Sequence, residues 1–145
     1  MQVFVPMDTL SCSAWVLDKA RAGNQCWRES VTLYKGGWPN HPASKLFADY
    51  PAAMCDYNVA LIEMINYRGW CSSDTYNKWL EYWTSELAKH GDVILPPWWG
   101  DEEIHSSHRA VLLHKNYKWY SQFGWKETPL PPDPVTKRFG YVWPY

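Results

Sequence analysis

The chain has 145 residues, of which 46% are hydrophobic and 20% charged, and its formal net charge is −1. This length suits one domain with its own core, and the hydrophobic content excludes a disordered chain. No apolar run reaches the length of a membrane span, and the N-terminal residues lack the basic and apolar regions of a signal peptide.

The first predicted elements lie in the N-terminal third of the chain. Residues 2–6 are β-prone and predict a short extended segment. Capping residues then predict a helix over about 9–19. A second helix follows to about residue 34, with a break or bend at Gly23, and the pair that begins with Gly36 ends it.

A polar pattern runs through this second helix. Arg21, Gln25, Arg28 and Glu29 recur at i, i+4, i+7 and i+8, so they share one face of an α-helix. Such a face is either a salt-bridged, solvated exterior or the lining of a cleft that holds one carboxylate for chemistry. Spacing alone favours the solvated face, because charge runs on helices usually form one.

The loop over 36–42 holds two glycines and two prolines, which fix its path. His41 lies between Asn40 and Pro42 and so cannot sit in the middle of a helix. It is either a loop histidine bonded to the backbone or a functional group held in place. The residues alone favour the backbone role.

The rest of the chain is predicted to be helical up to a C-terminal tail. The expected segments are helices over 44–50, 51–68, 72–90 and 101–115, a rigid apolar loop over 93–100, an aromatic stretch over 117–125, and an irregular Pro-rich tail over 126–145 that wraps the core. The sequence therefore predicts an all-α fold: a compact single domain over 1–145, with about five to six helices and long ordered loops rich in Trp and Pro.

One helix face carries His105 and His108 at i, i+3, next to Arg109. A pair of histidines at this spacing can bind a metal, but no third ligand is in view. Donors beside an arginine suit a phosphate better. We expect neither a metal nor another cofactor.

Cysteine usage gives a further expectation. Cys12, Cys26, Cys55 and Cys71 form no CxxC pair and have no histidine at zinc-site spacing. We expect reduced, mostly buried thiols in a cytoplasmic protein.

Charge is unevenly distributed along the chain. Residues 1–45 hold five basic and three acidic side chains, residues 46–104 hold three and ten, and residues 105–145 hold six and two. If the two basic ends meet in space, they present a positive face to an anion such as nucleic acid. The alternative is chance asymmetry on an ordinary surface.

Four groups of residues, in order along nearly the whole chain, carry a resemblance to a known family. They are Leu17-Asp18 with Arg21, Gly23, Gln25 and Trp27-Arg28-Glu29; Gly37-Trp38-Pro39-Asn40-His41-Pro42-Ala43-Ser44-Lys45; Pro96-Pro97-Trp98-Trp99-Gly100-Asp101-Glu102 with His105-Ser106-Ser107-His108-Arg109 and Leu112-Leu113; and Trp119-Tyr120, Phe123-Gly124 and Tyr141-Val142-Trp143-Pro144. This set resembles the endonuclease V family of pyrimidine-dimer DNA glycosylase/AP lyases, known from phage and bacteria. The resemblance implies a compact, mainly helical domain.

The resemblance also implies a mechanism. The α-amine of the mature N-terminus would attack C1′ of the damaged nucleotide, form an imine and release the base, and β-elimination would then nick the strand. Glu29 would stabilise the cationic sugar and assist the proton transfers, with Arg28 beside it. Gln2 is too bulky for the usual removal of the initiator Met, so the expected amine is that of Met1, or that of Gln2 if Met1 is removed.

The implied partner is double-stranded DNA that contains a lesion, bound by a monomer, with no membrane involved. The implied DNA contacts are Arg21, Gln25, His41, His105, His108, Arg109, Lys115, Lys118, Trp119 and Tyr120. A non-catalytic DNA- or nucleotide-binding protein of the same fold is the alternative.

Overall fold

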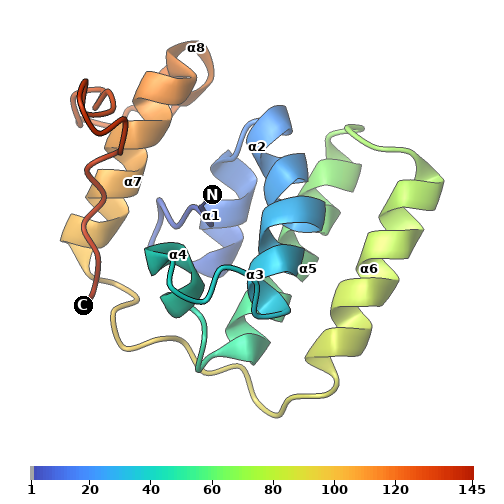
Figure 1. Ribbon diagram of the computed structural model, residues 1–145. Coiled ribbons are helices and arrows are strands. Elements are labelled where there is room, and N and C mark those ends of the chain that lie inside the picture. The colour runs from blue at the N-terminus through green and yellow to red at the C-terminus, as the bar shows by residue number, and fades with distance from the viewer. Residues whose placement is uncertain (1) are drawn as a thin grey trace.

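The computed structural model describes residues 2–145, and within this range every regular element is helical and no strand occurs (Figure 1). The elements are α1 (Leu10–Val16), α2 (Lys19–Asn24), the π-helical turn η1 (Gln25–Glu29), α3 (Ser30–Tyr34), α4 (Pro42–Lys45), α5 (Pro51–Tyr67), α6 (Ser73–Leu87), α7 (Glu102–Lys115), α8 (Tyr117–Tyr120) and the 3₁₀ turn η2 (Ser121–Phe123). The predicted all-α fold is confirmed.

The described residues form seven helical stretches, when α2, η1 and α3 are taken as one and α8 and η2 as another. Five of them correspond to helices predicted from the sequence. The sixth, α4, covers Pro42–Lys45, so the prediction of a helix over 44–50 is wrong for residues 46–50, where bends and a turn replace the helix. The seventh, α8 with η2, falls in the aromatic stretch for which no helix was predicted. It is separated from α7 by Asn116, whose extended backbone interrupts the helix and whose side chain then accepts a hydrogen bond from Trp119 N–H.

Several helices begin at a side-chain cap. Thr9, Ser72 and Asp101 precede α1, α6 and α7, and each accepts a hydrogen bond from a backbone N–H in the first turn. Such caps satisfy donors that the helix itself leaves without a partner. Helix α1 ends at Val16, earlier than predicted, because Leu17 and Asp18 adopt extended backbone conformations before α2 begins.

The expected break at Gly23 is absent. Helix α2 continues through Gly23 and ends at Asn24. The π-helical turn η1 begins at the next residue, Gln25, and there the helix is wider, by about one residue per turn. The backbone N–H of Ser30 donates to Gln25 O, which is the i→i+5 bond of a π-turn.

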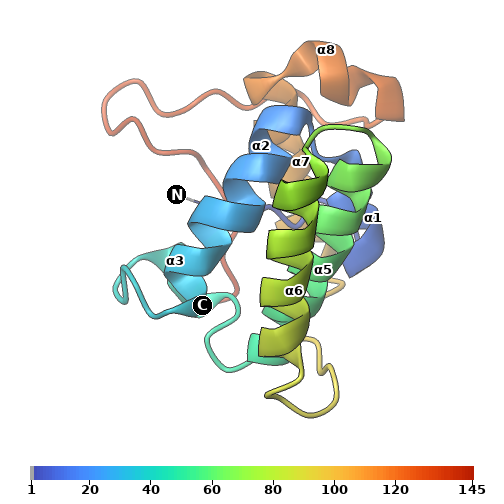
Figure 2. The ribbon, with the colours of Figure 1, turned by 90° about the vertical axis from the view of Figure 1, so that its right-hand side faces the viewer.

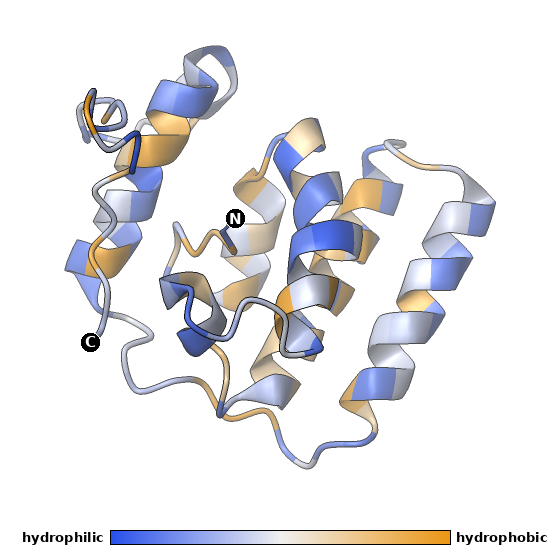
Figure 3. Cartoon of the chain, in the orientation of Figure 1, coloured by the Kyte–Doolittle hydropathy of each residue, from blue (hydrophilic) through white to orange (hydrophobic). Residues whose placement is uncertain are grey.

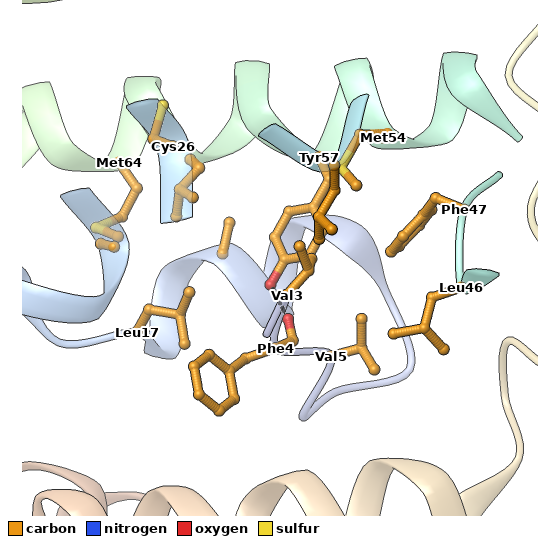
Figure 4. Close-up of a cluster of buried hydrophobic side chains, with 14 of the residues drawn as sticks. Val3, Phe4, Val5, Leu17, Cys26, Leu46, Phe47, Met54, Tyr57 and Met64 are labelled. Carbon is orange, nitrogen blue, oxygen red and sulfur yellow. Dashed lines mark hydrogen bonds between the residues drawn. The ribbon is translucent and has the colours of Figure 1, made fainter. Parts of the chain in front are cut away.

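The N-terminal segment passes through the centre of the molecule. Val3, Phe4 and Val5 are buried between α5 and α7, in contact with the core that includes Leu17 and Tyr57 (Figure 4). Helix α6 packs against α5. Most residues of α6 are hydrophilic, whereas α5 carries more hydrophobic residues (Figure 3), and most residues of α5 are buried. The extended segment predicted over residues 2–6 is therefore part of the core.

Beyond Phe123 the chain has no helix and returns along α7. Leu130 N–H donates to Ala110 O, and Val142 N–H donates to the Ser107 hydroxyl. Figure 2 shows this tail looping out from the helices near α8 and then returning, and the Tyr145 hydroxyl donates to the O atom of Pro42, the first residue of α4. Across residues 2–145, no helix is both long and apolar enough to cross a membrane.

Candidate functional site: a polar cleft at the chain start

A cleft of about 1130 Å³ lies between the helical stretch from α2 to η1 and the C-terminal tail. The polar and aromatic residues that line it are Gln2, Phe4, Arg21, Asn24, Glu29, Asn40, His41, Lys115, Lys137, Arg138, Phe139, Tyr141 and Trp143. They come from both basic ends of the sequence. The two ends do meet in space, and the cleft is where they meet.

Glu29 is the one carboxylate among the described residues that line this cleft. Its Oε1 accepts a hydrogen bond of 3.3 Å from Asn24 Nδ2, and its buried Oε2 has no hydrogen-bond partner among residues 2–145. A buried carboxylate oxygen that lacks a partner is costly, and such groups are often retained for binding or catalysis. The geometry therefore marks Glu29 as a functional group of the cleft.

The π-turn decides which side chains face the cleft. It brings Asn24 and Glu29, five residues apart, within hydrogen-bond distance of each other. It also separates residues that an α-helix would align: Gln25 is buried, whereas Arg28 is exposed and does not line the cleft. The predicted common face of Arg21, Gln25, Arg28 and Glu29 is thus wrong, because the α-helical period does not apply here.

The start of the chain reaches the same cleft. Gln2 is 7% exposed and lines the cleft, and its Nε2 has no hydrogen-bond partner within the described residues. Met1, the expected source of the reactive amine, lies outside the described residues. The peptide bond to Gln2 nevertheless tethers that amine to a residue of the cleft wall.

Side chains hold the buried N-terminal segment in place. Phe4 N–H donates to Gln25 Oε1 at 2.8 Å, and Val5 N–H donates to His108 Nδ1 at 3.0 Å. On the acceptor side, Val5 O is 2.6 Å from His105 Nδ1, and the Tyr57 hydroxyl donates to Phe4 O. Because the segment has no strand partner, these side chains satisfy backbone groups that would otherwise be buried and unpaired.

Three residues that were predicted to contact DNA belong to this network, and the prediction is wrong for each of them. Gln25 is 1% exposed, and His105 and His108 are 0% exposed, so none of them is accessible to DNA. Burial is the main cause that lowers the pKa of His108 to about 3, and His105 acts in the same direction, which keeps His108 neutral. The two histidines do lie on one face of α7, but this face points into the protein, where both rings bond to the backbone of Val5.

The prediction that Arg109 contacts DNA is also wrong. Its guanidinium pairs with Glu127 at 2.9 Å and with Glu102, and it donates to Pro6 O at 2.8 Å. The two carboxylates neutralise its charge, and Pro6 O ties it to the same N-terminal segment. Its donors are used within the protein.

The aromatic pair Trp119-Tyr120 divides between surface and core. Tyr120 is 0% exposed, and its hydroxyl donates to Asp18 Oδ1 at 2.5 Å while accepting from Asp18 N–H, so it is not a stacking surface for DNA. Trp119 is half-buried and lines a second cleft of about 790 Å³ together with Trp27 and Trp70. Only Trp119 of the pair is placed to meet a ligand.

His41 keeps the backbone role that the residues favoured. Its Nδ1 accepts from Ala43 N–H at 3.1 Å and caps α4, while its ring lines the cleft. Burial is the main cause that lowers its pKa; Arg138 acts in the same direction and Glu29 opposes it. His41 therefore serves the fold and still belongs to the cleft.

The cations of the cleft come from three elements. Arg21 lines it while donating to Asp18 Oδ2 at 3.0 Å, and Lys115 lines it with its ammonium group 4.3 Å from the centre of the Phe139 ring. Lys137 and Arg138 belong to the tail and were missed from the sequence, since nothing in a Pro-rich tail indicates which helix it faces. Lys118 is exposed and outside the cleft lining.

The arrangement of the possible metal ligands and of the thiols gives two further observations. No group of three or more His, Cys, Asp or Glu side chains within residues 2–145 is arranged to hold a metal ion. All four cysteines are free; Cys26 and Cys55 are buried, Cys71 is half-buried, and Cys12 is exposed. The expectation of mostly buried thiols is thus wrong for Cys12.

Comparison of the chain with protein-family models, with curated proteins and with solved structures finds no match.

Proposed function

We propose that the protein is a DNA glycosylase with AP-lyase activity, which excises a pyrimidine dimer or a related damaged or modified pyrimidine from double-stranded DNA. It acts as a monomer. The free thiols are compatible with a reducing compartment, and we place the activity in the cytoplasm.

One observation carries the proposal: Gln2, the first residue that the structure describes, and Glu29 line the same cleft. Chain termini are usually loosely held. Here Val3, Phe4 and Val5 are buried, and Gln25 and His108 bond to their backbone, so that Gln2 reaches the wall that also holds Glu29. These contacts hold Gln2 at the cleft wall, as the proposed amine chemistry requires.

The chemistry then follows from the amine and the carboxylate. An α-amino group has a pKa near ~8, so a useful fraction of it is neutral and nucleophilic at neutral pH. The amine nitrogen bonds to C1′ while the bond from C1′ to the base breaks, and opening of the sugar ring gives an imine. Glu29 would stabilise the positive charge that develops on the sugar and accept the C2′ proton as the 3′-phosphate leaves.

The cations of the cleft support a nucleic acid as the substrate. Arg21, Lys115, Lys137 and Arg138 line the same cleft as Glu29. Phosphates bound by these residues would release counterions, which favours binding despite the slightly negative net charge of the whole chain. Trp119, in the neighbouring aromatic cleft, offers a stacking surface.

Borohydride trapping tests the proposal. The protein is incubated with duplex DNA that contains an abasic site, borohydride is added, and the adduct is located by mass spectrometry of its peptides. We expect a reduced covalent adduct on the N-terminal peptide. Binding to this DNA with no adduct and no nicking would instead favour the non-catalytic DNA-binding alternative.

A further inference from the structure

Residues 133–138 of the tail form a loop that closes on itself. Asp133 N–H donates to Arg138 O, and Lys137 N–H donates to Asp133 O, each at 2.8 Å. The Asp133 carboxylate accepts from the N–H groups of Val135 and Thr136, also at 2.8 Å. The loop therefore holds its own shape while its side chains stay exposed.

Lys137 has a φ of 62°, in the left-handed region that side chains other than glycine rarely adopt. Such a conformation persists where surrounding bonds enforce it, and it is found most often at binding and active sites. Here the bonds to Asp133 enforce it. The result is that Lys137 and Arg138, adjacent in sequence, both line the cleft.

Three of the four cations that line the cleft form no ion pair among residues 2–145, whereas Arg21 is paired with Asp18. Neither Lys137 nor Arg138 forms an ion pair within the described residues, and Lys115 forms none either. Burial and the like charge of Arg21 lower the pKa of Lys115, and Arg138 contributes to the lowered pKa of His41. Cations that face one another without a protein counterion favour an anion as their ligand.

We propose that the 133–138 loop is a clamp for the sugar-phosphate backbone of nucleic acid, with Lys137 and Arg138 each contacting a phosphate in the cleft that Arg21 and Lys115 also line. The proposal rests on the proposed function and adds to it a binding element outside the family motifs, which stop at Gly124 and resume at Tyr141. Arginine suits this task because its planar fork matches a phosphate, and lysine supplies a compact charge.

The salt dependence of binding tests the clamp. Affinity for a duplex with an abasic site is measured by fluorescence anisotropy across a range of chloride concentrations. For a Lys137→Ala/Arg138→Ala variant, we expect the slope of log K against log salt to become less steep by about 1.8, which corresponds to two lost phosphate contacts. Lys78→Ala/Lys89→Ala removes the same charge from α6 and the turn that follows it, and should leave the slope unchanged. Equal slopes for both double variants would overturn the proposal.

Two further variants separate loop shape from net charge. Asp133→Ala removes a negative charge, so simple electrostatics predicts tighter binding, whereas loss of the hydrogen bonds that shape the loop predicts weaker binding. We expect weaker binding, and tighter binding would contradict an organised clamp. Lys137→Gly removes the charge but suits the left-handed backbone, so it should flatten the slope as much as Lys137→Ala does.

The same samples distinguish this proposal from the glycosylase chemistry. Wild-type protein that binds and nicks DNA, with a double variant that binds equally well at every salt concentration, would refute the clamp alone. A wild type with the expected salt slopes but no borohydride adduct would refute the chemistry and leave the clamp standing.

Discussion

The amide oxygen of Gln25 accepts a hydrogen bond of 2.8 Å from the backbone N–H of Phe4, 21 residues earlier in the chain. Gln25 begins the π-turn that ends at Glu29, and Phe4 lies two residues after Gln2. The bond thus joins the element that carries the carboxylate to the segment that carries the chain start. The two groups needed for the proposed chemistry belong to one connected unit.

Removal of this bond should cost stability and activity together. In Gln25→Met, Phe4 N–H would stay buried without an acceptor, and we expect the free energy of unfolding to fall by about 1–3 kcal/mol. Chemical denaturation measures the change. Nicking should fall further than DNA affinity, because the chain start loses its fixed position while the cations of the cleft remain.

Gln122→Met is the control for that variant. Gln122 is exposed and bonds only to Trp119 O, so its replacement should change stability by no more than about 0.5 kcal/mol. A cost for Gln25→Met as small as this would show that the bond to Phe4 does not hold the segment.

The stability of the fold should depend on pH through His108. The folded protein keeps the pKa of His108 at about 3, below its usual value of 6.5, because the ring is buried. The unfolded chain therefore binds a proton that the folded protein excludes between these values. Stability from this group is fully present above pH 6.5 and is lost as pH falls from 6.5 toward 3, by at most about 1.4 kcal/mol per pH unit.

Denaturation curves at several pH values between 5 and 6.5 measure this slope. Carboxylates with a lowered pKa, such as Glu127, lose their contribution mainly below their usual pKa of 4.5, outside this window. His108→Asn offers Val5 N–H an acceptor but does not titrate, so its slope should be flatter than that of the wild type. His114→Asn, at an exposed position, should keep the wild-type slope; a similar loss of slope in both variants would contradict the role of His108.

The long helices could be predicted from the sequence because their signals are local. Pro51 begins α5, Ser72 caps α6, and Asp101 caps α7, and the structure places each helix start where these residues indicate. A cap acts on donors within one turn of itself, so no knowledge of the rest of the fold is needed.

The site could be predicted only in part, because its geometry depends on contacts between distant residues. Glu29 and Arg21 do line a cleft, but the π-turn that turns Arg28 outward leaves no clear mark in the sequence. His105 and His108 read as a polar face because their partner, the backbone of Val5, lies 100 or more residues away. A polar side chain buried against backbone is indistinguishable in sequence from one that binds a ligand.

Gly23 should be required for the packing of Trp27. A Cβ atom at this position would lie 2.6 Å from Cζ2 of the Trp27 ring, so the indole would have to move. We expect Gly23→Ala to lower the free energy of unfolding, because the steric cost of about 1–3 kcal/mol exceeds the gain of about 1 kcal/mol from the higher helix propensity of alanine. Gly91→Ala, where no atom lies within 4 Å of the added Cβ, is the control and should change stability little.

Glu29→Gln separates chemistry from binding. Glutamine has nearly the same shape and can still accept from Asn24, but it carries no charge and is too weak a base to take the C2′ proton. We expect nicking of abasic DNA to fall by about 100-fold or more, as is usual for loss of a general base. Affinity should be kept or slightly improved, because the variant removes a negative charge from a cleft lined by cations.

Glu103→Gln, on an exposed first turn of α7, removes the same charge outside the cleft and should nick like the wild type. Full nicking activity in Glu29→Gln would remove the carboxylate from the mechanism, whereas a matching loss in Glu103→Gln would trace the defect to net charge.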